Sequence, residues 1–380
     1  MDKHLQKTQF GFRADKSTGD AIHLIRRALE FGESTQHFLY LVLLDWEKAF
    51  DKVDRNQLFN SMKRMGVDQK LIDITKSIYR ETVFCVELDG YTSDWLPQNT
   101  GIRQGCPLSP YLFLIVMTTL FHDVHLKLDH KLSRKRVPGA DYDEVTYADD
   151  TICITRSIST MNDFIKQIEE EGVKYGMRLN KTKCELLTNN VNGRIVFPDN
   201  SPVKRHRSAT YLGCEIGIRT TTREEISKRF AASMATMKKL DLFWRHSNCP
   251  THVKVYTADA VLRSKLLYGL ESAQLIPSIL KKLETFQLKV PRKILKIDTT
   301  YINRVNTNAS VFNRINTMME EEGKSKRVIS FVEAYSKLKR KRAVKILNQE
   351  NTSIHKVSFE NNKLRKWTHP KRRSGRPRAN

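Results

Sequence analysis

Two β-prone runs meet at a pair of adjacent carboxylates near the middle of the chain, and this feature constrains the fold most. Residues 141–146 and 151–155 flank Asp149 and Asp150, so we expect a hairpin whose tip exposes both side chains. Two neighbouring carboxylates repel each other unless a divalent cation lies between their oxygens. The alternative interpretation is a solvated turn, because Asp is a favoured turn residue.

A third carboxylate ends a continuous apolar run. Residues 38–44 are apolar and few, which is typical of a strand buried on both faces, and Asp45 follows them. If this strand neighbours the hairpin in one sheet, the three aspartates converge on a site for two metal ions. Polymerases, nucleases and phosphatases share that arrangement, so the carboxylates alone do not separate synthesis from hydrolysis.

The charge of the chain indicates a polyanionic partner. Its 380 residues carry 66 Lys and Arg against 42 Asp and Glu, a formal net charge of +24, as expected of a protein that neutralises phosphates. An anionic membrane surface competes as a partner, but we find no apolar run of bilayer length and no signal peptide. We therefore expect no membrane partner and an intracellular location, in the nucleus or the cytoplasm. Six cysteines without paired spacing predict neither a zinc site nor disulfides.

The sequence pattern changes near residue 219, beyond which helical periodicity with basic faces dominates. Residues 321–380 carry eighteen Lys and Arg against five Glu. The last ten residues are basic and poor in apolar side chains, which is typical of a tail that stays disordered until it binds nucleic acid. A merely solvating tail is the alternative. The candidate nucleic-acid-binding residues of this tail are Arg372, Arg373, Arg376 and Arg378.

Six motifs occur along the chain in a fixed order. They are QFGFR at 9–13, LDWEKAFDKV at 44–53, GIRQGCPLSP at 101–110, YADD at 147–150, GMRLNKTK at 176–183 and YLG at 211–213. Together they resemble the reverse transcriptase domain of non-long-terminal-repeat (LINE-type) retrotransposons, over roughly residues 9–217.

The resemblance implies an α+β right-hand polymerase with four parts. These are a remnant of the fingers (1–36), a palm with a small antiparallel sheet and the catalytic site (37–218), a helical thumb (219–320), and a basic nucleic-acid-binding extension that is partly disordered (321–380). Members of the family carry an Arg-Pro-Ile block before the first motif, and this sequence has no counterpart of it. The family's upstream endonuclease domain and its Cys/His zinc knuckle have no counterpart here either, and the sequence stops shortly after Gly375-Arg376-Pro377, so we expect the chain to be truncated at both ends.

The resemblance also implies roles for the acidic and basic residues of the site. Asp45, Asp149 and Asp150 match the catalytic aspartates that hold two Mg²⁺ ions, for which Mn²⁺ is a possible substitute. Lys183 matches the lysine that protonates departing pyrophosphate, a general-acid role for which Lys181 is the rival candidate.

Further matches concern the nucleotide and the primer. Phe50 matches the residue whose ring lies under the incoming sugar and excludes a ribose 2′-hydroxyl, although a core phenylalanine is the alternative. The nucleotide-binding loop is matched by Arg103, Gln104 and Gly105. The primer grip, which holds the 3′-hydroxyl at the metals, is matched by Tyr211, Leu212 and Gly213.

The activity implied by the resemblance is RNA-directed DNA polymerisation in a transposable element. The implied partners are an RNA template, a DNA primer and deoxynucleoside triphosphates (dNTPs). A second expectation is a catalytically impaired, nucleic-acid-binding remnant with a polymerase-like fold. A maturase or a telomerase-like reverse transcriptase shares the palm motifs and is the third. The sequence predicts no oligomeric state.

Overall fold

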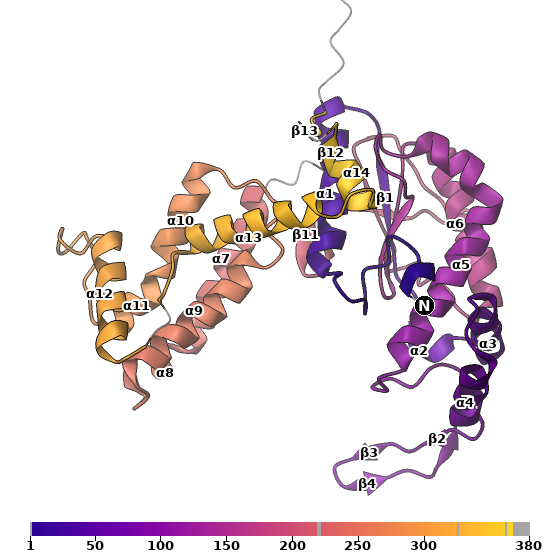
Figure 1. The fold of residues 1–380 in the computed structure, drawn as a ribbon, viewed down its shortest axis with the longest axis horizontal. Helices are drawn as coiled ribbons and strands as arrows, with labels where there is room; N and C mark the ends of the chain where they lie inside the picture. Colours follow the sequence, from indigo (N-terminus) through magenta and orange to yellow (C-terminus); the bar gives the residue numbers. More distant parts are fainter. Residues whose placement is uncertain (1, 219–221, 325–326, 362, 368–380) are drawn as a thin grey trace, which may run out of the picture. The chain divides into compact units, whose positions relative to one another are not determined.

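The computed structural model describes residues 2–218, 222–324, 327–361 and 363–367 (Figure 1). Contacts divide the chain into two compact units. Unit 1 comprises Met1–Ile218 and Glu350–Asn380, and unit 2 comprises Arg219–Gln349. Each unit has a hydrophobic core of its own.

A five-stranded sheet in the order β6-β7-β1-β8-β9 forms the centre of unit 1. Its strands are β1 (Tyr40–Leu44), β6 (Glu144–Tyr147), β7 (Asp150–Thr155), β8 (Glu185–Thr188) and β9 (Lys204–Arg205). β1 pairs antiparallel with β7 on one side and with β8 on the other, while β8 pairs parallel with β9. β1 is therefore an interior strand, which agrees with its uninterrupted apolar sequence.

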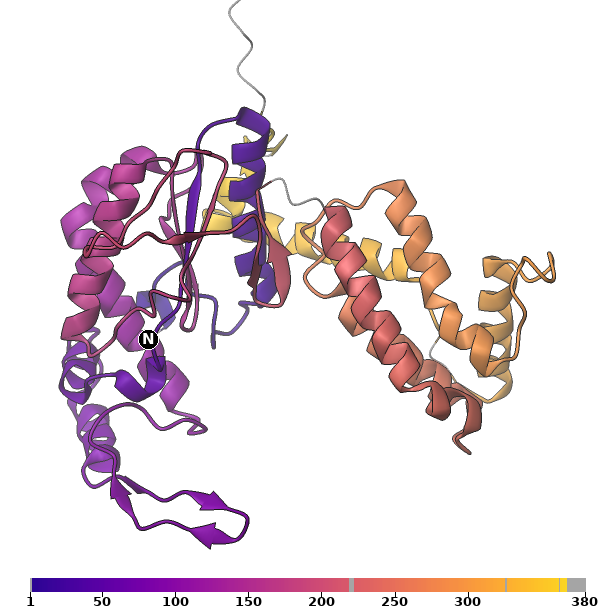
Figure 2. The same cartoon turned by 180° about the vertical axis from the view of Figure 1, so that it is seen from behind.

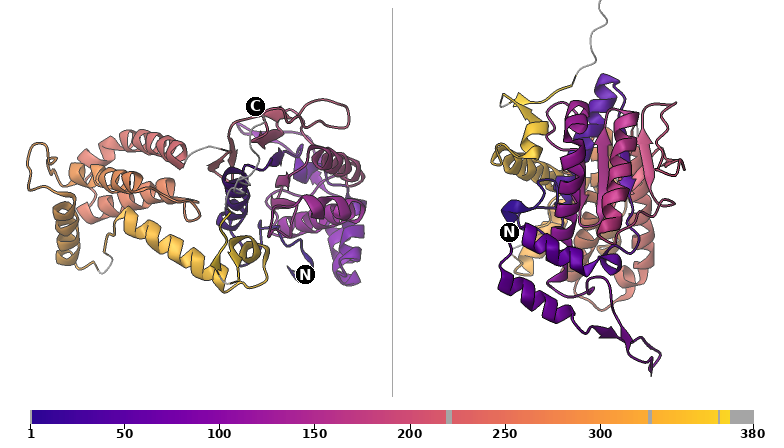
Figure 3. Two further views of the ribbon diagram at one scale, coloured as in Figure 1. Left: turned by 90° about the horizontal axis from the view of Figure 1, so that it is seen from above. Right: turned by 90° about the vertical axis from the view of Figure 1, so that its right-hand side faces the viewer.

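Helices cover both faces of this sheet, as Figure 1 and Figure 3 show. α1 (Thr18–Thr35) lies on one face, and α5 (Ser109–Leu132) and α6 (Ile158–Lys174) cover the other. Side chains alternate along a strand, so Val42 joins the core under α5 and α6 while Leu41, fully buried as well, points to the opposite face. Water is therefore excluded from both sides of β1.

Helix α5 is a core helix. Pro110 lies in its first turn, as its sequence predicts. By length and composition the segment Ser109–Lys135 would suffice to cross a bilayer, but most of it is buried inside unit 1. Its apolar character is thus explained by the core that it helps to form.

The other elements of unit 1 surround the sheet. They are η1 (Asp2–His4), α2 (Ala49–Lys52), α3 (Arg55–Arg64), α4 (Gln69–Tyr79), η2 (Ser133–Lys135), β10 (Ala209–Tyr211), β11 (Cys214–Ile216), α14 (Ser353–Ser358), β12 (Phe359–Glu360) and β13 (Lys363–Leu364). Helix α1 begins at a capping box formed by Ser17 and Asp20. Because α1 packs in unit 1, residues 1–36 do not form a separate body.

A two-part hairpin projects from unit 1 (Figure 2). Its strands, from base to tip and back, are β2 (Val83–Phe84), β3 (Glu87–Leu88), β4 (Tyr91–Thr92) and β5 (Leu96–Pro97). Asp89 and Gly90 form the turn with φ angles of 51° and 84°, as a type I′ hairpin turn requires. The side chains of all four strands are exposed.

The last described segment also belongs to unit 1. His23 Nε2 lies 2.8 Å from Ser358 Oγ, and Arg27 on α1 donates hydrogen bonds to the carbonyl of Val357 and lies 4.3 Å from the centre of the Trp367 ring. We expected residues 321–380 to form one basic extension, but the structure divides them between the two units. The reason is apolar burial, since Val357 is fully buried.

Unit 2 is helical in its described residues. Its helices are α7 (Thr222–Lys239), α8 (Asp241–His246), α9 (Thr251–Leu267), α10 (Pro277–Gln287), α11 (Lys289–Ile294), α12 (Asn308–Glu321) and α13 (Phe331–Leu347). Leu262 and Leu266 of α9 and Leu283 of α10 are buried in its core. The helical periodicity of this part of the sequence is thus explained by packing between helices.

A buried ion-pair network joins α5 to β6. His125 Nε2 lies 2.9 Å from Glu144 Oε2, and Arg136 Nε donates to both carboxylate oxygens of Asp143. Burial alone would lower the pKa of His125, but the charge of Glu144, the hydrogen bond to Glu144 and the charge of Asp143 together outweigh burial and raise the pKa to about 9. Burial raises the pKa of the Asp143 carboxyl to about 6.

Replacing His125 with Gln should change how stability depends on alkaline pH. A histidine whose pKa is raised by folding contributes stability that is complete below its unfolded pKa of about 6.5 and is lost as pH rises through about 9. The free energy of unfolding of the wild type should therefore exceed that of His125→Gln at about pH 6 and converge with it by about pH 9.5, measured by urea denaturation. His122→Gln, at an exposed position of the same helix, should follow the wild type. A difference that stays constant over this range would contradict the assignment.

Candidate active site

The register of the central sheet brings three aspartates to one end of two strands. In the ladder between β1 and β7, Leu44 lies opposite Thr151. The next position on each strand is Asp45 and Asp150, respectively. β1 and the hairpin are therefore neighbours in one sheet, which is the condition that convergence of the three carboxylates requires.

The hairpin of β6 and β7 closes through a two-residue turn. Tyr147 pairs with Asp150, so Ala148 and Asp149 form the turn. Ala148 has a φ of 58°, in the left-handed region that alanine rarely adopts. The side chains of Asp149 and Asp150 are exposed, and the side chain of Asp45 is 40% exposed. All three carboxylates can therefore be reached from solvent.

The pKa values of Asp149 and Asp150 are both raised. Desolvation by the surrounding protein is the largest cause for both Asp149 and Asp150, and the charge of Asp45 adds to it in each case. The pKa of Asp150 rises to about 6, with Asp149 as the strongest repelling charge. A set of three carboxylates suits a hard divalent cation such as Mg²⁺, which binds oxygen and neutralises this repulsion. The residues present thus fit the metal that the motifs imply.

Two lysines near the end of this sheet have different neighbours. Lys183 Nζ lies 3.9 Å from Asp45 Oδ2. Lys181 Nζ instead lies 2.7 Å from Asp199 Oδ2 and 3.3 Å from Glu169 Oε1. Because two other carboxylates hold Lys181, Lys183 is the better candidate for a proton donor at the aspartates.

The loop that contains residues 101–105 runs along the segment that follows Asp45. Ile102 N donates to Phe50 O at 2.7 Å, and Gln104 Nε2 donates to Asp51 Oδ1 at 3.0 Å. Gly105 has a φ of 84°, and nothing lies within 4 Å of where a Cβ would stand. Phe50, Gln104 and Gly105 are thus brought together, and sequence reasoning assigned no role to Asp51.

Phe50 lies at the edge of the main core. Its ring is stacked on Phe113 with centroids 4.4 Å apart and planes at 15°, and the residue is only half-buried. One face of the ring therefore packs on protein while the side chain keeps access to solvent. Arg103, in the adjoining loop, is exposed.

Tyr211, Leu212 and Gly213 form the turn region of the hairpin of β10 and β11. Leu212 and Gly213 have φ angles of 46° and 74°, which is the geometry of a type I′ turn. Tyr211 is 3% exposed, and its hydroxyl has no hydrogen-bond partner among the residues that the structure describes. Burial, and then the charge of Asp150, raise the pKa of this hydroxyl well above its usual value. The charge of Asp150 therefore acts on the Tyr211 hydroxyl and disfavours its ionised form.

The four arginines of the C-terminal tail are the remaining candidate site residues. Arg372, Arg373, Arg376 and Arg378 lie outside the described residues. Their nucleic-acid-binding role stays a prediction.

One polar cluster has the residue types of a metal site, but its ligand atoms already bind other side chains. The ligand atoms of His125, Asp129 and Asp143 all lie within 4.8 Å of one another. Arg136 donates hydrogen bonds to both of these aspartates, and His125 is bound to Glu144. The carboxylates already have cationic partners, so we interpret this cluster as a structural ion-pair network. Sequence reasoning missed it because its members come from separate elements.

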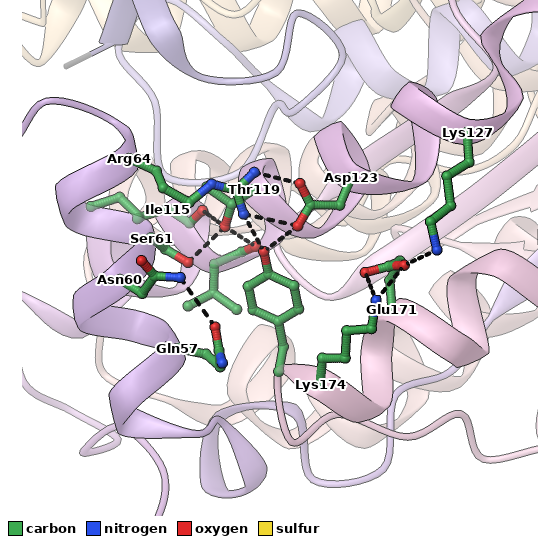
Figure 4. Close-up of polar contacts among 12 residues, drawn as sticks. Gln57, Asn60, Ser61, Arg64, Ile115, Thr119, Asp123, Lys127, Glu171 and Lys174 are labelled. Atoms are coloured by element: carbon green, nitrogen blue, oxygen red, sulfur yellow. Dashed lines mark hydrogen bonds and ion pairs between the residues drawn. The ribbon is translucent and has the colours of Figure 1, made fainter.

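A second cluster lines a cleft of about 590 Å³ among residues of α3, α5 and α6 (Figure 4). Arg64 and the Tyr175 hydroxyl both donate to Asp123, at 2.8 Å and 2.7 Å. Glu171 accepts hydrogen bonds from Lys127 and Lys174. These carboxylates are paired across helices, so the cluster joins the helices that cover the sheet. No local sequence pattern predicts pairs so far apart.

The fold and the site define a class of protein. A small, mainly antiparallel sheet that carries an aspartate at the end of β1 and two at a neighbouring hairpin, with helices on both faces, is the palm of a right-hand polymerase. Residues 1–216 match the family described as reverse transcriptase (RNA-dependent DNA polymerase), and the chain belongs to this family. The expected α+β right-hand polymerase fold is confirmed.

Known relatives come from non-long-terminal-repeat retrotransposons, which confirms the resemblance of the motifs. The RNA-directed DNA polymerase from mobile element jockey of Drosophila melanogaster is 26% identical over 320 residues, which cover 77% of this chain and 32% of the relative. The Pol polyprotein from the R2 element of Popillia japonica is 26% identical over 270 residues, which cover 68% of this chain and 43% of the relative. The chain thus spans less than half the length of these relatives. Among solved structures, apo telomerase from Candida tropicalis has a TM-score of 0.44 at 14% identity, covering 93% of this chain and 58% of that chain.

Removing the charge of Asp45 should lower the pKa of Asp150. Asp45 repels the ionised form of Asp150, so Asp45→Asn should move that pKa from about 6 toward the ordinary range, measured by carbon-detected NMR titration of the carboxyl group. Asp199→Asn removes an aspartate that is bound to Lys181 and should leave the pKa of Asp150 unchanged. An unchanged pKa in Asp45→Asn would mean that the two carboxylates do not interact.

Proposed function

We propose that the chain is an RNA-directed DNA polymerase that adds dNTPs to the 3′-hydroxyl of a DNA primer on an RNA template. The observation that carries this proposal is the convergence of Asp45 with Asp149 and Asp150 in a chain of the reverse transcriptase family. Asp149 and Asp150 are exposed to solvent and repel each other, and a raised pKa such as that of Asp150 in an accessible position is expected of a ligand-binding site. We place this activity inside the cell, in the nucleus or the cytoplasm, with no membrane partner.

The three aspartates would hold two Mg²⁺ ions, with Mn²⁺ as a possible substitute. When bound, such ions make the attacking hydroxyl more acidic and neutralise charge on the transferred phosphate. The contribution of the protein is to hold the three carboxylates together at one end of the sheet. The ladder of β1 and β7 does this through the backbone, so little rearrangement is needed.

Lys183 is proposed as the general acid that protonates the departing pyrophosphate. It lies beside Asp45 and is exposed, so its ammonium group can approach a bound triphosphate. The turn of Tyr211, Leu212 and Gly213 is proposed as the primer grip. Positioning of the primer 3′-hydroxyl lowers the entropic cost of the reaction.

The nucleotide is proposed to bind at the 101–105 loop. Gly105 leaves open space for a base pair, and Gln104 is held by Asp51 at its side. Arg103 is exposed and free to reach a phosphate or the template strand. Phe50 would lie under the sugar, where its ring leaves no room for a ribose 2′-hydroxyl.

Primer extension tests the role of the aspartates. Asp45→Asn and Asp149→Asn should each slow extension of a labelled DNA primer on an RNA template with Mg²⁺ by at least about a hundredfold, because each removes a metal ligand. Asp199 binds Lys181 and is not one of the three site aspartates. Asp199→Asn should therefore extend the primer at the wild-type rate. Wild-type extension by a folded Asp149→Asn protein would refute the assignment, and degradation of the primer without extension would indicate a nuclease.

The charge of the chain favours a second candidate function, which is nucleic-acid binding without catalysis. A formal net charge of +24 provides affinity for RNA or DNA whether or not the aspartates bind metal. Binding that falls steeply with salt concentration, together with no incorporation of dNTPs by the wild type, would select this function over the polymerase. Template-dependent incorporation would exclude it.

Shortening Phe50 should relax the choice of sugar. Phe50→Val opens space beside the incoming nucleotide and should raise incorporation of ribonucleotides relative to deoxynucleotides by about tenfold or more, measured by single-nucleotide primer extension. Phe59→Val is the matched control, because Phe59 is another half-buried ring on the same core. Equal discrimination in Phe50→Val and the wild type would show that Phe50 is a core residue alone.

A further inference from the structure

We infer that Gln9 is a positioning residue that holds the turn of the aspartate hairpin. This inference rests on the proposed function, because it takes Asp149 and Asp150 as the catalytic pair. The QFGFR motif contributed to the family resemblance, but neither the motif nor the proposed mechanism assigns a task to Gln9. Its contacts in the structure suggest one.

Both polar atoms of the Gln9 side chain bind the backbone of the turn. Ala148 N donates to Gln9 Oε1 at 2.9 Å, and Gln9 Nε2 donates to Ala148 O at 3.3 Å. Gly11 N donates to the same Oε1 at 2.8 Å. Gln9 is fully buried, so these bonds are shielded from competition by water.

The backbone around Gln9 is attached to the outer strand of the hairpin. Thr146 N donates to Thr8 O at 3.0 Å, and Phe10 N donates to Thr146 O at 2.9 Å. Residues 8–10 therefore run beside β6 as a short parallel partner. Gly11 completes the contact, since a Cβ at this position would stand 2.5 Å from Ala148 N. A segment 130 or more residues away in sequence thus fits against the turn without a gap.

The turn needs such support for two reasons. Ala148 adopts a φ of 58°, which costs free energy for any residue with a side chain. Asp149 and Asp150 follow it and repel each other. A glutamine amide satisfies the donor and the acceptor of Ala148 at once, whereas Met offers neither group and Asn is one methylene shorter. Residues that hold metal ligands in place typically change metal affinity tenfold to a hundredfold when replaced.

A buried glutamine of unit 2 provides the matched control. Phe331 N donates to Gln287 Oε1 at 2.6 Å, and Gln287 Nε2 donates to Ile329 O at 2.9 Å. Gln287 is 3% exposed, so Gln287→Met removes two comparable bonds to the backbone from a similarly buried place, together with one bond to Asp259 Oδ1 at 3.2 Å. It does so in a unit that does not contain the three site aspartates.

Amide hydrogen exchange tests whether Gln9 holds the turn at Ala148, without reference to activity. In Gln9→Met, exchange at Ala148 N should accelerate at least about tenfold, while exchange at Val42 N in β1, which reports opening of the whole unit, should change much less. Gln287→Met should leave Ala148 N at the wild-type rate. If Gln9→Met does not fold, Gln9→Asn keeps the amide but cannot span the distance, and the same acceleration is expected. Unchanged exchange at Ala148 N in the folded variant would overturn the inference.

Metal binding separates a positioning role from a merely structural one. Tb³⁺ serves as the probe, because Trp46, which follows Asp45 in the chain, can sensitise its emission. We expect the dissociation constant for Tb³⁺ to rise about tenfold in Gln9→Met and to stay unchanged in Gln287→Met. Faster exchange at Ala148 N with unaltered Tb³⁺ binding would show that Gln9 supports the fold alone, and would overturn its role as a positioning residue.

The two proposals fail in distinguishable ways. If wild-type protein binds no Tb³⁺, or binds it equally well after Asp45→Asn, the metal site of the proposed function is wrong, and the positioning role of Gln9 falls with it. If the wild type binds Tb³⁺ through Asp45 but Gln9→Met binds it equally well, the proposed function stands and the inference about Gln9 is wrong.

Discussion

The antiparallel ladder between β1 and β7 is the interaction on which the rest of unit 1 depends. It runs from Tyr40 opposite Thr155 to Leu44 opposite Thr151. Side chains alternate between the two faces, so a slip of one residue would exchange the apolar side chains that β1 buries under α5 and α6 with the differently shaped ones that it buries on the opposite face. The same slip would separate Asp45 from the hairpin. Core packing and the geometry of the site therefore select one register, and burial of apolar side chains holds the carboxylates together against their repulsion.

The carboxylates of unit 1 have two kinds of neighbour, which are basic partners for some and other carboxylates for the rest. Buried carboxylates such as Asp143 and Glu144 are bound by Arg136 and His125. Asp150 is instead next to like charges, and desolvation, followed by the charges of Asp149 and Asp45, raises its pKa to about 6. Folding thus disfavours its ionised form, and the stability that Asp150 contributes falls as pH rises from its unfolded pKa toward about 6. Such an unfavourable arrangement is tolerated where a bound cation can reverse it, which is why charge repulsion marks a functional site.

Local patterns in the sequence predicted the parts of this structure that depend on local forces. The apolar run that ends at Asp45 and the β-prone runs around Asp149 indicated the strands, and their pairing followed once one sheet was assumed. Contacts between distant segments leave no such pattern. The bond between Gln104 and Asp51 joins two motifs that sequence reasoning treated separately. The packing of α14 on α1 was missed because basic composition was weighed above a few buried apolar side chains such as Val357.

Residues 1–36, which we expect to be a remnant of the fingers, contact the central sheet of unit 1. Residues 8–10 pair with β6, α1 covers one face of the sheet, and Gln9 fills the space behind the turn. An edge strand without a partner leaves unpaired amide and carbonyl groups, so β6 alone would be a poor support for two aspartates that repel each other. The N-terminal segment therefore supports the palm in a physical sense, since its bridge to Thr146 pairs part of the free edge of β6 beside the turn.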